Sequence, residues 1–501
     1  MNNENYEKTD ADSAQLQQLG YTSKFDRSMS LWENFSLGFT YLSPVVGVYS
    51  VFALALVSGG PPMVWNYVLI GLGQFLVCLV FGEVVSQFPI SGGIYPWTRR
   101  LVGKRWAWMA GWIYLWALCT TIAAVAVGGA PYLANLLNFT DTHAMEIALA
   151  LGMVFLTTCL NVSGTRLLAR VAMTGFICEL VGAIVVGSYL LLFARHQSVS
   201  ILFQTFHVEG SKSYFSAFVA SSVAAMFCYY GFEACGDVAE ETPNPGIAIP
   251  RAMRMTIYIG GAAAIFVTLA LMLSIPNMPA ALSGSDQDPV ITTLRNALSP
   301  LAVRGVISVV LISFFSCLLS LQAATSRLLF AYGRDGMIAG SDHLNKLSER
   351  AKMPVNALLV AGIVPALIVV GGYFLQNTVQ TIVTFGAAGI YVAFQMVVVG
   401  ALFARIKGWE PAGEFRLGRW GLTTNILALT YGLSAIVVMV WPRSPSDPWY
   451  LNYGMILTTF IVIILGTSYM VILRPYEKGT APSGDAHLLS KTAKAEPPAL
   501  K

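Results

Sequence analysis

Twelve apolar runs, each long enough to cross the roughly 30 Å hydrocarbon core of a bilayer, make up most of this 501-residue chain. Only 11% of its residues are charged, against about 25% in soluble domains, and its mean hydropathy is +0.63. We therefore expect an all-α polytopic membrane protein with twelve transmembrane helices. The runs lie near residues 34–57, 64–88, 107–137, 144–161, 171–194, 214–239, 253–275, 303–332, 355–374, 378–404, 421–441 and 451–473.

The polar ends of the chain and its basic residues predict how it crosses the membrane. Residues 1–31 carry no cleavable signal pattern, and residues 475–501, rich in Lys, Ala and Pro, are typical of a disordered tail. If the N-terminus is inside, nearly all Lys and Arg fall on the inner side, as the positive-inside rule requires. The outer side keeps only Arg195, Lys212, Arg295, Arg304 and Arg443. We expect a multi-pass protein of the cell membrane, plasma or inner, with both termini in the cytosol.

Two of the runs contain helix-breaking residues. Ser43-Pro44-Val45-Val46-Gly47 interrupts the first run, and Gly231 lies inside the sixth, in the stretch Phe227-Cys-Tyr-Tyr-Gly-Phe-Glu233. Lipid offers no partner to free backbone N–H and C=O groups, so unwound backbone persists in a membrane only where it lines a cavity. Interrupted helices at corresponding places in two halves of a chain indicate the substrate site of a secondary transporter.

The polarity of each break predicts what it binds. The N–H groups of Val45, Val46 and Gly47 begin a half-helix, which attracts a carboxylate. The carbonyls of residues 227–230 end a half-helix and suit an ammonium group. Together they predict a site for a zwitterion. For the first break, an ordinary proline kink repaired by a neighbouring helix is the alternative interpretation.

Two glutamates lie in mid-membrane positions, Glu179 in the fifth run and Glu233 in the sixth. A charge at the bilayer centre costs roughly 2.5–3.5 kcal/mol on insertion scales, and burial favours the protonated carboxyl. Either group is therefore a candidate to carry a coupling proton, the alternative being a protonated carboxyl that only hydrogen-bonds a neighbouring helix. Ser316 and Ser320 of the eighth run either complete a Na⁺ site or simply bond across packed helices.

A further group of acidic residues lies at the predicted cytosolic ends of the runs, close to basic residues. We interpret these acids as solvated groups or as gate-forming ion pairs. They are Glu83, Asp237, Glu240 and Glu241, beside Arg99, Arg251 and Arg334.

Other classes of function lack their sequence signals. The five His lie in loops or tails without metal-ligand spacing, and no nucleotide-binding loop is present. The seven Cys lie inside apolar runs, so we expect neither a metal site nor a structural disulfide. The net charge of +4 is spread over short loops, which argues against nucleic-acid binding. We expect no enzymatic activity and no cofactor other than a coupling ion, H⁺ or Na⁺.

Several short motifs follow one another along the chain: Gly82-Glu83-x-x-Ser86-x-x-Pro89-x-Ser91-Gly92-Gly93-x-Tyr95, Asn161-x-x-Gly164, Gly231-x-Glu233, Glu240-Glu241-x-x-Asn244-Pro245-x-x-x-x-Pro250-Arg251 and Gly333-Arg334-Asp335-Gly336. In this order, and over residues 32–474, they resemble the amino acid–polyamine–organocation (APC) permeases. No single motif is specific, but the combination is. The first break is more similar to the amino acid/choline branch, which includes γ-aminobutyrate (GABA) and choline permeases.

The resemblance implies a LeuT-type inverted repeat, residues 32–200 against 213–408, with two accessory helices in 420–474. It also implies roles for the residues at the breaks: Ser43, Val45, Val46 and Gly47 form the carboxylate-binding turn, Phe227 the aromatic gate, and Tyr230 and Gly231 the amine-binding break. Glu179 stands where many relatives carry a Lys at the coupling-cation position, which is a departure from their coupling mechanism.

The main hypothesis is active import of a small amine-bearing metabolite, such as GABA, by alternating access coupled to H⁺ or Na⁺. Choline or a polyamine is the rival substrate, and amino acid antiport is the rival mode. A transport-inactive nutrient sensor is the alternative from another class, although such a protein would usually add a sizeable soluble domain. The expected partners are a small-molecule substrate and the lipid bilayer, while the sequence leaves the oligomeric state open.

Overall fold

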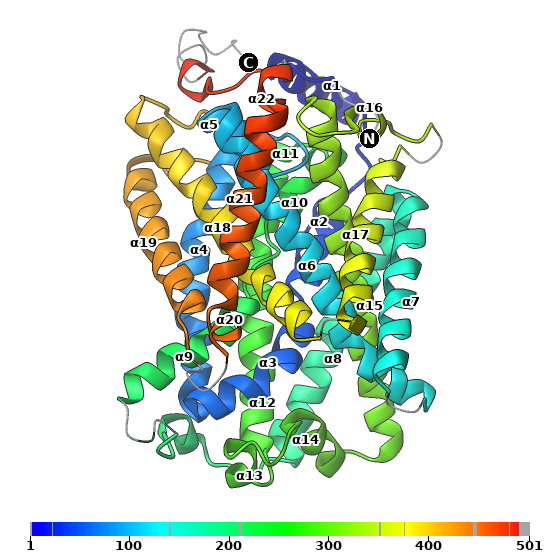
Figure 1. The fold of residues 1–501 in the computed structure, drawn as a ribbon, viewed down its shortest axis with the longest axis vertical. Helices are drawn as coiled ribbons and strands as arrows, with labels where there is room; N and C mark the ends of the chain where they lie inside the picture. The colour runs from blue at the N-terminus through cyan, green and yellow to red at the C-terminus, as the bar shows by residue number, and fades with distance from the viewer. Residues whose placement is uncertain are drawn as a thin grey trace.

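The computed structural model of the chain is all-helical across the residues that it describes (Figure 1). These are residues 3–489 except 23, 140–141, 209, 211–212, 350–351, 375, 444–447 and 480. Within them, 11 segments are long and apolar enough to cross a membrane. Most of these segments run along the long axis of the molecule, and both chain ends lie at the same end of the bundle (Figure 1). The fold class expected from the apolar runs is confirmed.

The spanning segments are, in chain order, α2 (Leu31–Leu42) with α3 (Pro44–Gly59), α4 (Val64–Gln87), α6 (Lys104–Leu137), α7 (His143–Val162), α8 (Thr165–Phe193), α11 (Pro245–Met255) with α12 (Gly261–Ser274), α15 (Pro300–Arg334), α17 (Val355–Phe374), α18 (Gln376–Ile406), α19 (Gly421–Val440) and α21 (Gly454–Leu473). The shorter helices include α1 (Asn3–Gln18), α5 (Ile94–Leu101), α9 (Tyr214–Phe227), α10 (Ala234–Asp237), α13 (Met278–Leu282), α14 (Pro289–Ala297), α16 (Ser341–Leu344), α20 (Trp449–Asn452) and α22 (Pro475–Lys478). We call the end that carries α1, α16 and α22 the terminal end, and the opposite end, with α13 and α14, the loop end (Figure 1).

The distribution of side chains is the one that lipid favours. Large apolar side chains on the outer helix faces are exposed, for example Phe155, Leu192 and Ile464, while polar groups such as Gln74 and Asn161 are buried in the interior. An exposed apolar belt of this kind is unstable in water but satisfied in a bilayer. The interior can therefore hold polar chemistry that the outer surface cannot.

The sixth predicted run, residues 214–239, does not form one continuous spanning helix. α9 ends at Phe227, residues 228–233 are not helical, and α10 adds only a single turn before a 3₁₀ turn at Ala239–Glu241. The interruption predicted around Gly231 leaves an apolar helix too short to count as a span by length. The number twelve therefore stays a prediction, and so does the inverted repeat of residues 32–200 and 213–408.

The tail predicted to be disordered is ordered in the part that the structure describes. Pro475–Lys478 forms α22, Asp485 makes an ion pair with the buried Arg100, and Gly484 N–H donates to the Arg99 carbonyl at 2.9 Å. The prediction of disorder is wrong for this stretch, because composition does not reveal that two arginines of α5 offer it charge and hydrogen bonds. Residues 490–501 lie outside the described residues.

Candidate substrate site between two helix breaks

The first break is a complete interruption between α2 and α3. Ser43 has a left-handed backbone (φ 41°) and is followed by Pro44, the first residue of α3. Proline has no N–H to donate and its ring fixes φ, so it suits the start of a helix and not its interior. The chain therefore begins a new helix here, which exposes the first N–H groups of α3 to whatever lies beside them.

A carboxylate does occupy the start of α3, and it belongs to the protein itself. Glu179 of α8 accepts hydrogen bonds from Val45 N–H and from the Ser43 hydroxyl, both at 2.8 Å through Oε1. Val46 N–H turns to the Ser43 Oγ at 3.3 Å, and Gly47 N–H to the Ser43 carbonyl at 2.9 Å. These N–H groups were predicted to await a substrate carboxylate. In this structure all three are already satisfied from within the chain.

Glu179 is an unusual buried acid. Its side chain is fully buried, and among the described residues no cation forms an ion pair with it and Oε2 has no hydrogen-bond partner. Removing a bare charge from water costs several kcal/mol, so such a group is stabilised by its hydrogen bonds, by a helix N-terminus or by a proton. The first two of these are present here.

The second break, in the sixth run, is capped by an acid of its own turn. Gly231 has φ +113°, a conformation that side-chain-bearing residues rarely adopt. Its N–H donates to Glu233 Oε2 at 2.8 Å, and the Tyr114 hydroxyl of α6 donates to Glu233 Oε1 at 3.1 Å. Glu233 thus holds the unwound backbone and is itself held from another helix.

The two breaks touch. A Cβ atom added at Gly231 would lie 2.6 Å from the backbone nitrogen of Leu42, the residue before Ser43. On either side of this point, a Cβ at Gly47 would meet the Cys228 Sγ at 2.7 Å and one at Gly38 would meet the Cys235 Sγ at 2.6 Å. The interrupted segments therefore cross with their backbones in close contact. A movement of one segment must displace the other.

A cavity of about 170 Å³ lies beside this crossing. Since a buried water needs about 10–15 Å³ on this scale, the cavity has room for roughly a dozen waters or one small organic molecule. Predicted site residues Val46, Gly47, Phe227 and Tyr230 line it, together with Tyr41, Leu42, Ser50, Val51, Thr121, Ala124, Val125, Cys317 and Ala387. The Tyr41 hydroxyl is buried and has no hydrogen-bond partner among the described residues.

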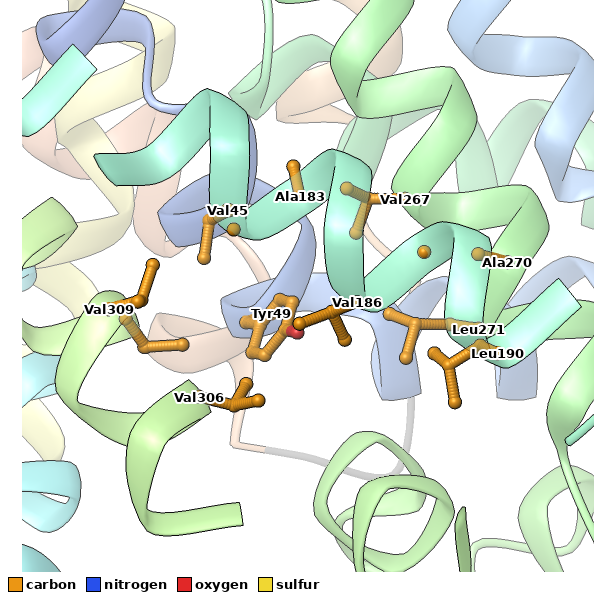
Figure 2. A pocket seen from close by; sticks show the side chains of 13 residues that line it. Val45, Tyr49, Ala183, Val186, Leu190, Val267, Ala270, Leu271, Val306 and Val309 are labelled. Carbon is orange, nitrogen blue, oxygen red and sulfur yellow. The ribbon is translucent and has the colours of Figure 1, made fainter. Parts of the chain in front are cut away.

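Val45 lines a second, much smaller cavity and not the central one. Figure 2 shows Val45 and Tyr49 of α3 facing Ala183, Val186 and Leu190 of α8 across it. Its volume of about 20 Å³ holds little more than one water, and its lining is almost entirely aliphatic. We assign it to imperfect helix packing. Of the predicted site residues, Ser43 and Val45 therefore belong to the Glu179 contact and not to the wall of the central cavity.

The central cavity adjoins a larger hollow toward the loop end. This vestibule has a volume of about 550 Å³ and shares Ser50 with the central cavity. Its lining includes Asp288, the N-cap of α14, and Arg295 of that helix. Burial raises the pKa of Asp288, but two backbone N–H groups and Arg295 oppose that rise. The approach to the site from the loop end is thus wide and polar.

At the terminal end, by contrast, ion pairs close the bundle. Glu241 binds Arg327 through two bonds of 2.8 and 3.0 Å, and Glu240 binds Arg334 at 2.7 Å. Asp335 pairs with Arg99 and also accepts from the Tyr21 hydroxyl at 3.2 Å. Burial and the Asp335 carboxylate raise the pKa of Tyr21 to about 12, so its phenol stays a hydrogen-bond donor at neutral pH.

The predicted gate acids are thus distributed over different partners. Glu240 and Arg334 pair as expected, Glu241 pairs with Arg327, and Glu83 pairs with Arg405 of α18. Asp237 has no ion pair among the described residues. The predicted hydroxyls Ser316 and Ser320 of α15 are buried at the α2–α8 side, where the Ser320 and Thr40 hydroxyls lie 2.8 Å apart. Their role in ion binding stays a prediction.

Sequence reasoning missed several residues that line or support the site. Tyr41 and Ser50 lie within one or two helical turns of the first break, so a search at helical spacing around Pro44 would have found them. Tyr114, Thr121 and Cys317 come from distant helices, and no local pattern marks them.

A sequence model of the family described as "Amino acid permease" matches residues 29–466. The chain is 23% identical to the amino-acid permease BAT1 of Arabidopsis thaliana, over 94% of this chain and 96% of that protein. It is 24% identical to the BAT1 homolog of Oryza sativa, over 94% and 95%, and 24% identical to a putative polyamine transporter of Candida albicans, over 92% and 87%. With the fold and the family match, the chain belongs to the amino acid permease family of the APC superfamily.

Proposed function

We propose that the protein is a secondary active transporter that imports a small amine-bearing metabolite, with an amino acid such as GABA as the first candidate. The observation that carries this proposal is the cavity of about 170 Å³ beside the point where the two broken helices touch. Binding there acts on both breaks at once. A bound substrate can therefore change the conformation of both broken helices, which alternating access requires.

The wall of the cavity supports recognition of an amine. Phe227, Tyr230 and Tyr41 supply aromatic rings, and the Tyr41 and Tyr230 rings meet edge to face at 6.0 Å. Aromatic faces attract organic cations, and the free Tyr41 hydroxyl adds a hydrogen-bonding group. A small ammonium group fits both the size and the chemistry of this space.

A substrate without a carboxylate, such as choline or a polyamine, is the second candidate. The observation that favours it is Glu179, which already holds the N–H group of Val45. An amino acid needs either to displace this carboxylate or to bind its own carboxylate elsewhere, for example near Ser50 or Thr121. The relative from Candida albicans, described as a putative polyamine transporter, is consistent with this candidate.

The transport cycle follows from the difference between the two ends of the bundle. The structure is wide at the loop end and closed at the terminal end, so release requires the pairs Glu240–Arg334 and Glu241–Arg327 to separate. We place the terminal end in the cytosol of a cell membrane, where the positive-inside rule puts it. We propose H⁺ or Na⁺ as the coupling ion, with Glu233 as the first coupling residue.

The test is uptake by purified protein in proteoliposomes, with labelled amino acids including GABA, choline and putrescine. Imposed pH and Na⁺ gradients are applied separately. We expect at least one amine to accumulate against its gradient under one of the two ions. Binding of substrate with no transport under any gradient would instead support a nutrient sensor, and exchange without accumulation would support an antiporter.

A further inference from the structure

Asp237 differs from every other acid of the terminal-end gate. Its side chain is fully buried, and neither carboxylate oxygen has a hydrogen-bond partner among the described residues. Glu83, Glu240, Glu241 and Asp335 each have an arginine partner. Ionising a buried acid that has no hydrogen bonds costs several kcal/mol of desolvation free energy, so such a group in a protein needs a functional explanation.

The position of Asp237 links the substrate site to the gate. It lies one helical turn beyond Glu233, and its N–H donates to the Glu233 carbonyl at 3.3 Å. On the gate side, its carbonyl accepts from Gly92 N–H at 3.1 Å, and its carboxylate fills the space where a Cβ of Gly93 would stand. Asp237 thus sits between the second break and the closed terminal end.

The titratable and charged groups that interact electrostatically with Asp237 come from four elements. Glu233 and Cys235 lie on its own segment, Tyr41 on α2, Tyr114 on α6 and Arg327 on α15. Arg327 is the cation of this set, and Glu241 already holds it in a two-bond pair. The Tyr114 hydroxyl donates to Glu233 and makes no hydrogen bond with Asp237, although the two groups interact electrostatically. Two fully buried acids therefore lie one helical turn apart, and a tyrosine is hydrogen-bonded to one of them.

We propose that Asp237 is a second proton-binding site, which receives the coupling proton from Glu233 and releases it at the terminal end. The inference rests on the proposed function, in the form in which H⁺ drives transport. Two neighbouring carboxylates in a low-dielectric site cannot both be ionised at little cost, so the pair retains a proton that either member can hold. Among the buried acids of the described residues, Asp237 is the one with both carboxylate oxygens lacking a hydrogen-bond partner.

The transfer step balances through Tyr114. In this structure the Tyr114 hydroxyl donates to Glu233 and makes no hydrogen bond with Asp237, so the transfer requires the phenol to turn its O–H toward Asp237. The O–H bond of Glu233 then breaks as its proton passes to the Tyr114 oxygen, and the phenol O–H bond breaks as its proton passes to an Asp237 oxygen. Glu233 is left as a carboxylate that still accepts from Gly231 N–H, and Asp237 is left neutral. When the pairs of Glu240 and Glu241 separate, Asp237 is the first acid of the relay to meet water, and it loses the proton there.

The experiment compares Asp237→Asn with wild type in proteoliposomes that contain a pH-sensitive dye, with the substrate found in the uptake panel. The amide keeps the shape of Asp237 but cannot take the proton. We expect Asp237→Asn to exchange internal for external substrate while losing pH-driven accumulation and the substrate-induced H⁺ uptake. The matched control is Asp342→Asn, which makes the same change at an exposed acid of α16 at the same end of the bundle, outside the gate pairs and the relay, so its ratio of H⁺ to substrate should equal that of wild type.

The possible outcomes separate this inference from the proposed function. Wild-type H⁺ uptake that persists in Asp237→Asn overturns the inference alone. Transport by wild-type protein that moves no H⁺, or that follows Na⁺, overturns both the inference and the proton-coupled form of the function. If Asp237→Asn does not fold, Tyr114→Phe replaces it, because it removes the hydroxyl through which the proton is proposed to pass. An unchanged ratio of H⁺ to substrate in that variant also overturns the relay.

Discussion

At each of the two helix breaks a glutamate accepts hydrogen bonds from free backbone N–H groups, but the two glutamates come from different parts of the chain. At Gly231 the cap is Glu233, two residues further along the chain, so the break and its cap move together. At Ser43 the cap is Glu179, 134 residues after Val45 and on another helix, so the break stays capped only while α3 and α8 keep their relative position. The first break is therefore tied to the scaffold, and the second carries its own acid. We infer that Glu179 stabilises the packing of α3 against α8, and that Glu233 couples proton binding to transport.

The backbones at the two breaks also differ in what they tolerate. Ser43 holds a left-handed conformation with a side chain, at a cost of roughly 1–2 kcal/mol, and its hydroxyl donates to Glu179. Gly231, at φ +113°, has neither a side chain nor room for one. Substitutions at the second break should therefore be far more damaging to function than changes around the first.

The largest effect is expected for Gly231→Ala. The new Cβ would collide with the Leu42 backbone and force the two breaks apart, so substrate binding and transport should both be lost while the protein still inserts. Binding of labelled substrate to detergent-purified protein, with size-exclusion chromatography as the folding check, measures this. Gly152→Ala in α7 is the matched control, because a Cβ there meets nothing within 4 Å. Wild-type affinity in Gly231→Ala would remove this crossing from consideration as the substrate site.

A smaller effect is expected at the first break. Glu179→Ala leaves Val45 N–H and the Ser43 hydroxyl without their acceptor, which should lower the free energy of unfolding by about 1–3 kcal/mol. Glu179→Gln keeps a carbonyl acceptor at nearly the same volume and should lose less. Thermal unfolding in detergent compares the two variants. Equal stability of wild type and Glu179→Ala would show that this contact does not hold α3 to α8.

Sequence reasoning located the breaks because their causes are local. Proline lacks an N–H group and glycine can adopt positive φ, so each interrupts a helix at its own position. The breaks at Pro44 and Gly231 could therefore be predicted from the sequence. The cap at Gly231 was within reach for the same reason, since Glu233 is two residues away. The glutamate that caps the break at Ser43 could not be predicted, because the contact of Glu179 of α8 with Val45 depends on how the whole bundle packs.

The gate shows the same limit. Charges at the ends of adjacent segments predicted an ion-paired closure, and Glu240 with Arg334 fits that prediction. The pairing of Glu83 with Arg405 and the isolation of Asp237 depend on helix rotation, which charge patterns do not contain. The order of the described tail residues, 475–479 and 481–489, was missed because its partners, Arg99 and Arg100, lie far away in the chain.

The most direct test of the central claim, that the second break carries the coupling acid, compares Glu233→Gln with Glu179→Gln in the same proteoliposome assay. Each change mimics a protonated carboxyl at nearly constant volume. We predict that Glu233→Gln still exchanges internal for external substrate but no longer accumulates it on a pH gradient, whereas Glu179→Gln does both. Accumulation by Glu233→Gln on a pH gradient alone, or its loss in Glu179→Gln only, would contradict the account.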